Sequence, residues 1–421
     1  MANRARVIYQ SEALYAGTVD ATGHHFFTGA NASDGVAEDG ASVTRTGIQQ
    51  LHRVQSANYS FSINRQDVNQ FGQLARIDSV SIEPPTVTLD FSYYLTNGFN
   101  EQTLGFNIDG GSDSTWSQAL SDELLLGKTA DADNPGGKNF FILTTAEGSD
   151  AVGSDLSVEQ GKSTIALGNG FVSNYSIEAA VGGMPTASVT VDGLNLRSYT
   201  GTAGLDNPAI NTTFGIPVTG TEFSLPPAVS GKSDAGADGI WGNVDDTEGD
   251  AGIACLRPGD ISLSLGLDGR AGEFELLPSK GPATDYEGSG SAHIQSFSID
   301  VPISRSVINR LGNPYGYARV TDFPVNISVS VSAILSDLKV GNVADLLFNE
   351  EQHDLTFTMR EPNASGIGAT TLEYKVKGAR LEGESFSTSI GDNKSVDLTF
   401  TAQLGGQEDK TNGLFISGSA A

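Results

Sequence analysis

The chain has 421 residues, 38% of them hydrophobic, which is long enough for two or three domains with hydrophobic cores. Its 51 acidic and 24 basic residues give a net charge of −27, and a surface of that sign repels the phosphates of nucleic acids. Tight nucleic-acid binding is therefore not expected. The low charged fraction, 18%, and the 51 glycines favour strands and turns over long helices.

Cys255 is the only cysteine in the sequence, which excludes an internal disulfide and a thiolate metal cluster. The first eleven residues lack the apolar core of a signal peptide. No apolar run approaches the roughly eighteen residues of a membrane helix. We therefore expect synthesis in a reducing cytoplasm and no membrane partner.

The first strands are predicted from alternating side chains. A short β-like run covers Val7 to Tyr15, and the polar, glycine-rich segment from Thr22 to Val43 is typical of an exposed loop or arm. Apolar and polar residues then alternate from Asn58 to Ile63 and again from Val87 to Tyr93. This pattern predicts two long antiparallel strands joined by an extended loop.

Two helices are predicted beside these strands. The segment from Ser112 to Gly127 begins with possible N-cap residues, carries apolar side chains at helical spacing and closes with glycine. A shorter segment, residues 341–350, begins with the N-cap candidate Asn342. Both are expected to pack on a sheet.

Two blocks of sequence recur along the chain. Val54 to Gly72 aligns without a gap with Ile294 to Gly312 at an offset of 240. Thr164 to Asp192 aligns with Glu373 to Thr401 at an offset of 209, and apolar positions stay in phase throughout. Because a slip of one residue would turn every side chain to the wrong face, this agreement predicts a tandem duplication.

The duplication predicts two domains, residues 1–200 and 201–421. The offsets differ by 240 − 209 = 31, so the first copy carries about 31 extra residues between the two blocks. A Gly/Asp-rich insertion at about residues 228–258 is expected in the second domain.

The sequence offers little for catalysis. Its histidines are His24, His25, His52, His293 and His353, and none has metal-ligand spacing. Phosphate-binding, dinucleotide-binding and nucleophile-elbow motifs are absent as well. His24 and His25 lie in a polar segment and are expected to be solvated. We therefore expect no enzyme activity and no cofactor.

One acidic segment is a weak calcium candidate. Asp234, Asp238, Asp245 and Asp246 lie around glycine turns and could offer the oxygen ligands that calcium prefers. Their spacing fits no EF-hand loop, and Asp-Gly runs are ordinary solvated turns. The main expectation is that no metal binds.

The polar faces of the predicted strands carry hydroxyl and acidic side chains, and no lysine or arginine is expected there. A solvated sheet face explains the polarity, although it does not explain why the charges share one sign. The residues in question are Ser60, Ser62, Thr88, Asp90, Ser92, Glu178, Ser188, Asp192, Asp300, Ser328, Ser330, Asp397 and Thr399.

The sequence resembles the tail tube (major tail) proteins of long-tailed bacteriophages, in the subgroup whose chain carries two tube domains. The resemblance is carried by Asn169 to Leu194, by the strand pair from Asn58 to Tyr94, by the helix that follows this pair, and by Leu256 to Leu265. It implies a mainly β fold, with a tail-tube-type β-sandwich or barrel domain and a flanking helix in each copy.

What the resemblance implies for function is mechanical. Each domain would lend strands to a closed barrel of about 24 strands in a trimeric, pseudo-hexameric ring, wide enough for a channel. Stacked rings would form the tube of a virion tail, assembled in the host cytoplasm. The thirteen polar residues would line the lumen, through which DNA passes without specific binding.

The resemblance also implies partners. They are other copies of the chain and the tape-measure, baseplate and tail-terminator proteins. Ring-to-ring contacts are expected from Gln66 to Gln73, Ser306 to Tyr317 and the N-terminal arm. Two alternatives remain open: a distal tail or baseplate ring of the same fold, and a calcium- or glycan-binding β-sandwich adhesin.

Overall fold

The computed structural model describes most of the chain as antiparallel β-sheet. The described residues are 12–19, 27–28, 44–45, 48–109, 116–121, 124–125, 137–145, 151, 162–212, 214–219, 222–225, 228, 233–234, 247–248, 255–266, 293–316, 318–334, 352–360, 370–387, 395–406 and 409–418. Their helical residues are the short α-helix α1 (Phe99–Leu104), the 3-10 turn η3 (Pro258–Asp260), and Leu124 and Leu125. The expectation of a mainly β protein is confirmed.

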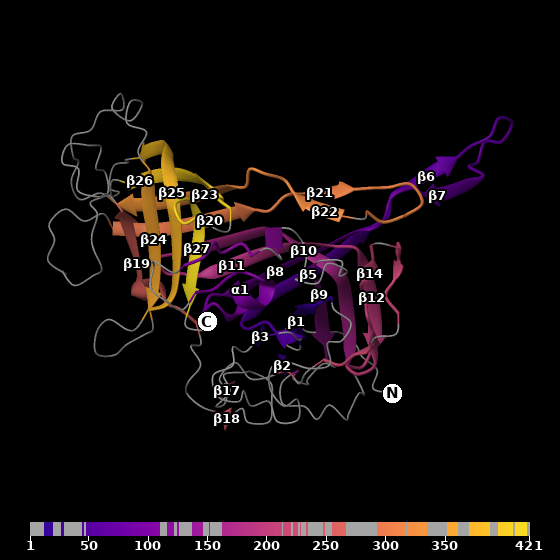
Figure 1. Ribbon diagram of the computed structural model, residues 1–421, viewed down its shortest axis with the longest axis horizontal. Coiled ribbons are helices and arrows are strands. Elements are labelled where there is room, and N and C mark those ends of the chain that lie inside the picture. The colour runs from indigo at the N-terminus through magenta and orange to yellow at the C-terminus, as the bar shows by residue number, and fades with distance from the viewer. Residues whose placement is uncertain are drawn as a thin grey trace.

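A continuous sheet of eight strands forms the centre of the molecule (Figure 1). In spatial order its strands are β5 (Val54–Ser62), β8 (Thr86–Tyr94), β11 (Thr186–Gly193), β10 (Ser163–Ala180), β20 (His293–Pro302), β23 (Asn326–Ile334), β26 (Ser395–Gln403) and β25 (Thr370–Ser387). Four of these strands come from the first half of the chain and four from the second. The predicted antiparallel pair is confirmed as β5 and β8.

Two outer sheets pack against the central one. The first contains β4 (Gln49–Gln50), β1 (Glu12–Thr18), β9 (Lys138–Thr144), the start of β10, and β12 (Asn195–Thr200). The second contains β19 (Ile261–Gly266), β24 (His353–Arg360), the start of β25, and β27 (Gly413–Gly418). Strands β10 and β25 therefore each belong to an outer sheet and to the central sheet.

The remaining strands form small hairpins and two-residue pairs. They are β6 (Arg65–Val68), β7 (Asp78–Ser81), β21 (Arg305–Ile308), β22 (Ala318–Thr321), β2 (Phe27–Thr28), β3 (Thr44–Arg45), β13 (Leu205–Asp206), β14 (Ile210–Asn211), β15 (Ile216–Pro217), β16 (Glu222–Phe223), β17 (Ser233–Asp234) and β18 (Thr247–Glu248). In Figure 1 the β21–β22 hairpin lies along the first half of the chain, whereas the β6–β7 hairpin projects away from the body.

The two long strands bend at corresponding residues. Asn169 in β10 has a φ of 51° and Gly378 in β25 a φ of 71°, and 378 − 169 = 209. Asparagine tolerates this left-handed backbone better than most residues. Its Oδ1 also accepts a hydrogen bond from the Ile210 amide at 2.7 Å. Each bend lies where a strand leaves its outer sheet for the central one.

The pairing registers of the two halves also correspond. Ser60 faces Thr88 between β5 and β8, and Asp300 faces Ser328 between β20 and β23, so both positions shift by 240. Ser176 faces Ser188 between β10 and β11, and Ser385 faces Asp397 between β25 and β26, a shift of 209 at both positions. The same register therefore recurs.

A single large hydrophobic core runs through both halves of the chain. Phe91, Ile177, Ile299, Val329 and Val376 all belong to it, although they come from five different strands. A smaller cluster lies on the other side of β1 and β9. The boundary predicted at residue 200 stays a prediction.

A buried carboxylate lies at the centre of this core. Glu101 on α1 is 1% exposed, and its Oε1 accepts hydrogen bonds from the hydroxyls of Tyr93, Tyr175 and Tyr374 at 2.9, 3.0 and 3.3 Å. The Tyr175 and Tyr374 hydroxyls are also 2.9 Å apart. Because Tyr374 comes from the second half of the chain, this group joins the two halves.

The prediction of a helix from Ser112 to Gly127 is wrong for residues 116–121, which the structure describes. Residues 116–119 are not helical, and Leu120 forms an isolated bridge with Phe106. The Ala119 amide donates to the carbonyl of Leu414 in β27 at 2.8 Å, so its hydrogen bond goes to a strand of the other half. Of the residues that the structure describes in this segment, Leu124 and Leu125 alone are helical. The helix expected over residues 341–350 lies outside the described residues.

We predict that Glu101→Ala lowers the free energy of unfolding by at least about 2 kcal/mol, because buried hydroxyls lose their acceptor. Denaturant unfolding measures the change. Glu222→Ala, at an exposed position of β16, is the control and should change stability by less than about 0.5 kcal/mol. Equal effects of the two variants would contradict a structural role for Glu101.

The pH dependence of stability gives a second prediction at Glu101. Burial raises the pKa of this carboxyl above its ordinary value of 4.5. The stability that it contributes is therefore fully present below that value and is lost as pH rises through the folded pKa. We expect the stability difference between wild type and Glu101→Gln to shift against wild type as pH rises above 4.5. A constant difference across pH would contradict this.

Candidate functional site: a polar sheet face and two open edges

One face of the central sheet is polar across all eight strands. Directly opposed residues of neighbouring strands share a face, so the register identifies rows of side chains. One row reads Ser56, Ser92, Ser188, Ser176, Asp300, Ser328, Thr401 and Arg380, from β5 to β25. The opposite face carries the apolar residues of the core.

All thirteen residues predicted from the polar pattern lie on this face, and none of them is buried. Thr88, Ser92, Asp192, Asp300 and Ser328 are half-buried, and the other eight are exposed. Sequence phase therefore identified the face. That it lines a lumen stays a prediction.

Acidic side chains on this face are held by neutral hydrogen-bond donors. The carboxylates of Asp90, Asp300, Asp397 and Glu382 accept from Thr190, Asn174, Ser385 and Thr401 at 2.8, 3.2, 3.5 and 2.6 Å, respectively. A hydroxyl or amide donor orients a carboxylate without cancelling its charge. The face therefore keeps its negative charge.

The expected absence of basic residues from this face is wrong at Arg380. This exposed arginine lies opposite Thr401, in the last strand of the sheet. Sequence alignment of the repeated blocks places it at the position of Phe171, since 380 − 171 = 209. The alignment alone does not indicate a charge at this position of the face, because the matched residue Phe171 is apolar.

The β21–β22 hairpin covers part of the face in the first half of the chain. Arg305 and Arg319 lie over the ring of Phe171, with their guanidinium carbons 5.2 and 5.4 Å from its centre. Arg319 also donates to the Asp192 carbonyl at 3.2 Å. Burial lowers the pKa of Arg305 to about 10, because the charged guanidinium is largely removed from water.

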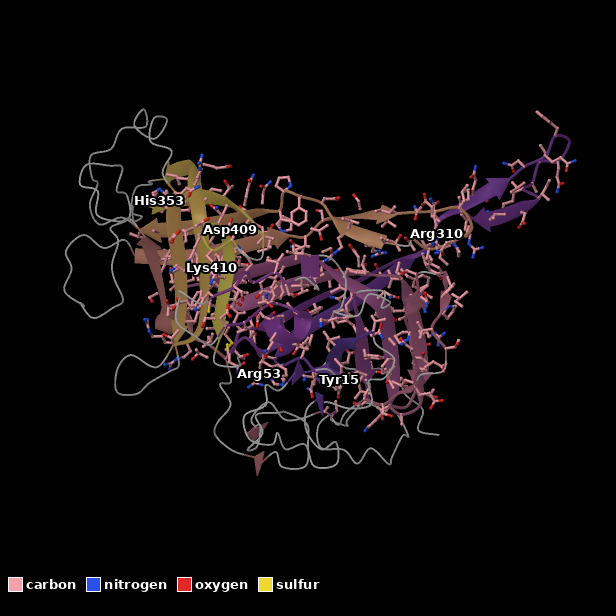
Figure 2. The ribbon with its side chains drawn as sticks, viewed as in Figure 1. Tyr15, Arg53, Arg310, His353, Asp409 and Lys410 are labelled. Atoms are coloured by element: carbon pink, nitrogen blue, oxygen red, sulfur yellow. The ribbon has the colours of Figure 1, made fainter. Side chains whose placement is uncertain are left out.

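Further contacts hold this hairpin within the chain. Arg305 donates to the Leu124 carbonyl and Thr321 to the Leu125 carbonyl. Near the hairpin tip, the Asn313 amide group donates to the Thr212 carbonyl at 2.7 Å. The loop expected to contact another ring, Ser306 to Tyr317, therefore contacts the first half of its own chain through Asn313. In Figure 2, Arg310 marks the far end of this hairpin.

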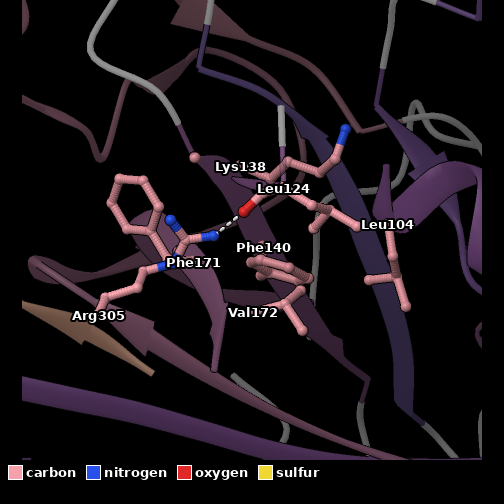
Figure 3. Close-up of a pocket in the computed structure, with 9 residues that line it drawn as sticks. Leu104, Leu124, Lys138, Phe140, Phe171, Val172 and Arg305 are labelled. Carbon is pink, nitrogen blue, oxygen red and sulfur yellow. Dashed lines mark hydrogen bonds between the residues drawn. The ribbon is translucent and has the colours of Figure 1, made fainter. Parts of the chain in front are cut away.

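A small cavity lies beneath Arg305 (Figure 3). It is lined by Leu104, Leu124, Phe140, Phe171 and neighbouring residues, and its volume of about 10 Å³ has room for about one water molecule. Such a cavity is too small for an organic ligand.

The central sheet ends in two strands with an open side. Among the described residues, β5 pairs with β8 alone, and residues 380–387 of β25 pair with β26 alone. Unpaired strand edges present rows of backbone donors and acceptors that readily pair with another chain.

The side chains of β5 show what its open edge lacks. Tyr59, Phe61 and Ile63 are 43%, 60% and 44% exposed. The residues at their matched positions on β20 and beyond it, Ile299, Val301 and Ile303, are each 0% exposed. Strand β20 pairs with β10, whereas no described strand pairs with β5 on the corresponding side. Tyr59, Phe61 and Ile63 therefore form an exposed apolar surface, which no described strand covers.

The described part of the chain contains no group of three or more histidine, cysteine, aspartate or glutamate residues placed to hold a metal. Asp234 belongs to β17, and Asp238, Asp245 and Asp246 lie outside the described residues. Within the same part, no helix is long and apolar enough to cross a membrane.

Comparisons with known proteins assign no family. Neither a protein-family model nor a curated protein sequence matches this chain. A functional proposal therefore depends on the geometry of the polar face and the open edges.

We predict that Asp90→Asn changes the free energy of unfolding by less than about 1 kcal/mol, since Asp90 is exposed and has a neutral partner. Leu89→Ala, in the adjacent buried position, should cost about 2–5 kcal/mol. Denaturant unfolding compares them. A loss of similar size for Asp90→Asn would mean that the acidic face serves the fold itself.

Proposed function

We propose that this protein is a tail tube protein of a long-tailed bacteriophage, whose copies form stacked rings around a channel for genome passage. The observation that carries the proposal is the difference in exposure between Tyr59, Phe61 and Ile63 and their matched residues Ile299, Val301 and Ile303. The apolar surface is buried where β20 pairs with β10 and exposed at the open edge of β5. A second copy of the chain could bury the exposed surface in the same way.

The chain is a tandem duplication of one tube domain. Matched pairing registers, the matched left-handed residues Asn169 and Gly378, and the matched hairpins support this view. Each domain contributes four strands to the central sheet. The junction of β10 with β20 is then an internal version of the contact between chains.

Ring closure joins the two open edges. Strand β5 of one chain pairs with residues 380–387 of β25 in the next chain, in the register of the internal junction. Ser176 faces Asp300 in that junction, so Ser385 faces Ser60 between chains, since 385 − 176 = 209 and 300 − 60 = 240. Such a head-to-tail contact closes a ring when the rotation per chain permits it. Closure removes both open edges.

Three chains complete the ring in this proposal. They supply about 24 strands, more than the 16–18-stranded porins that already leave an aqueous channel. The polar face lines this channel, and the apolar faces pack outward on the outer sheets.

The lumen then repels DNA. Asp90, Asp300 and Asp397 keep their negative charge, because their hydrogen-bond donors are neutral. Repulsion acts over about 8 Å at physiological salt, so it matters where the channel wall approaches the phosphates. DNA therefore slides past the wall without binding. Tape-measure, baseplate and tail-terminator proteins are the partners that such a tube requires.

We predict that the purified protein forms rings and long tubes with a regular axial repeat in electron micrographs. Phe61→Asp should abolish rings with little change in the unfolding midpoint, because Phe61 is exposed in the single chain. Ile216→Asp, at an exposed apolar residue of β15, is the matched control and should leave rings intact. Isolated rings would indicate a baseplate ring instead. A protein that stays monomeric at high concentration would contradict the proposal.

Charge reversal of the lumen tests genome passage. Phage assembled with Asp90→Lys and Asp397→Lys should eject DNA more slowly, since lysines in the channel bind phosphate. Glu222→Lys, a single acid-to-lysine change at an exposed position of β16, is the control and should eject normally. Unchanged ejection from intact tails with both lumen lysines would count against these residues facing DNA.

A further inference from the structure

The two hairpins carry different chemistry on corresponding faces. In β21–β22, the cross-strand pairs Arg305–Thr321 and Val307–Arg319 form the face that covers Phe171. The matched pairs in β6–β7, each shifted by 240, are Arg65–Ser81 and Asp67–Ser79. Compared with β21–β22, the β6–β7 hairpin therefore has Ser79 in place of Arg319 and the acid Asp67 in place of Val307.

The strands beneath the hairpins change in the opposite sense. Phe171 and Ser173 of β10 correspond to Arg380 and Glu382 of β25 at the offset of 209. Ser173 and Glu382 both occupy the extra position of a β-bulge. An aromatic and a neutral residue at the internal junction are thus replaced by a base and an acid at the open end of the sheet.

These paired changes are complementary in charge. One arginine and one acid on the β6–β7 face match one acid and one arginine on β25, whereas two arginines on the β21–β22 face match an aromatic ring. The side chains that would make this contact are also accessible. Arg65 and Asp67 are exposed on a hairpin that projects away from the body, and Glu382 is exposed and held by Thr401 at 2.6 Å.

We propose that the β6–β7 hairpin of one chain lies across the open end of the central sheet of a second chain, with Arg65 against Glu382 and Asp67 against Arg380. The contact is lateral, within one ring, and it rests on the ring closure proposed above. Asp67 already forms an ion pair with Arg76 at 2.8 Å, and both side chains are exposed. In the ring, Asp67 therefore lies between Arg76 of its own chain and Arg380 of the second chain. The hairpin thereby selects the open end of another chain over the internal junction.

A charge exchange tests this contact. Arg65→Glu and Glu382→Arg should each lower the yield of rings about tenfold, because each places like charges together. The double variant, Arg65→Glu with Glu382→Arg, should restore the yield to within about threefold of wild type, since the pair is opposite in sign again. Light scattering and electron microscopy measure the yield.

Asp78→Lys is the matched control on the same hairpin. Asp78 lies opposite Val68, on the face that points away from Arg65 and Asp67, so ring yield should not change. All four variants change exposed residues, and their unfolding midpoints should stay near that of wild type. Rescue by the double variant also excludes misfolding as the cause of a loss in either single variant.

The outcomes separate this contact from the proposed function. Wild type that forms no rings contradicts ring closure and, with it, the hairpin contact. If wild type forms rings and both single variants do so equally well, the hairpin contact is wrong while ring closure stands. Single variants that form rings but no tubes would place the hairpin between rings, which also overturns the lateral contact.

Discussion

The backbone pairing of β10 with β20, from Asn174 to Ala180, joins the two halves of this protein into one sheet. It depends on the bend at Asn169, which directs β10 out of its outer sheet, and it buries Ile299 and Val301. In the described part of the chain, the same strand order leaves β5 and residues 380–387 of β25 with a partner on one side only, at the two ends of the sheet. Backbone groups at such edges require partners, and water or another chain must supply them. The fold therefore provides the two open edges that the proposed self-assembly requires.

The core and the polar face have separate roles in this arrangement. Glu101 and its three tyrosines fix the two halves against each other in the interior, where an unpaired carboxylate would be costly. The polar face contributes little to the core, because its side chains bond mainly to one another. In the proposed tube, its serines, threonines and acids are thus available to face the DNA that passes along the sheet.

Periodicity explains how far the sequence could predict this structure. The offsets of 240 and 209 matched strand registers, because a period of two leaves no tolerance for a slip. The alternation of polar and apolar residues identified the polar face for the same reason. The failures are non-local: residues 116–119 have a helical pattern, but β27 supplies the partner of Ala119. Glu101 meets tyrosines 8, 74 and 273 residues away, which no local pattern reveals. Arg380 was missed because its partner in the alignment, Phe171, is uncharged.

Disulfide trapping between chains tests the central claim most directly. Ser60 of β5 and Ser385 of β25 should face each other across the ring closure, within the Cα separation of about 4.4–6.8 Å that a disulfide requires. With Cys255 replaced by serine, no native cysteine remains to compete. Oxidised rings of Ser60→Cys, Ser385→Cys protein should run as covalently linked multimers in denaturing gels, and each single cysteine variant should run as a monomer. Assembled rings that form no such link would contradict the proposed pairing of β5 with β25.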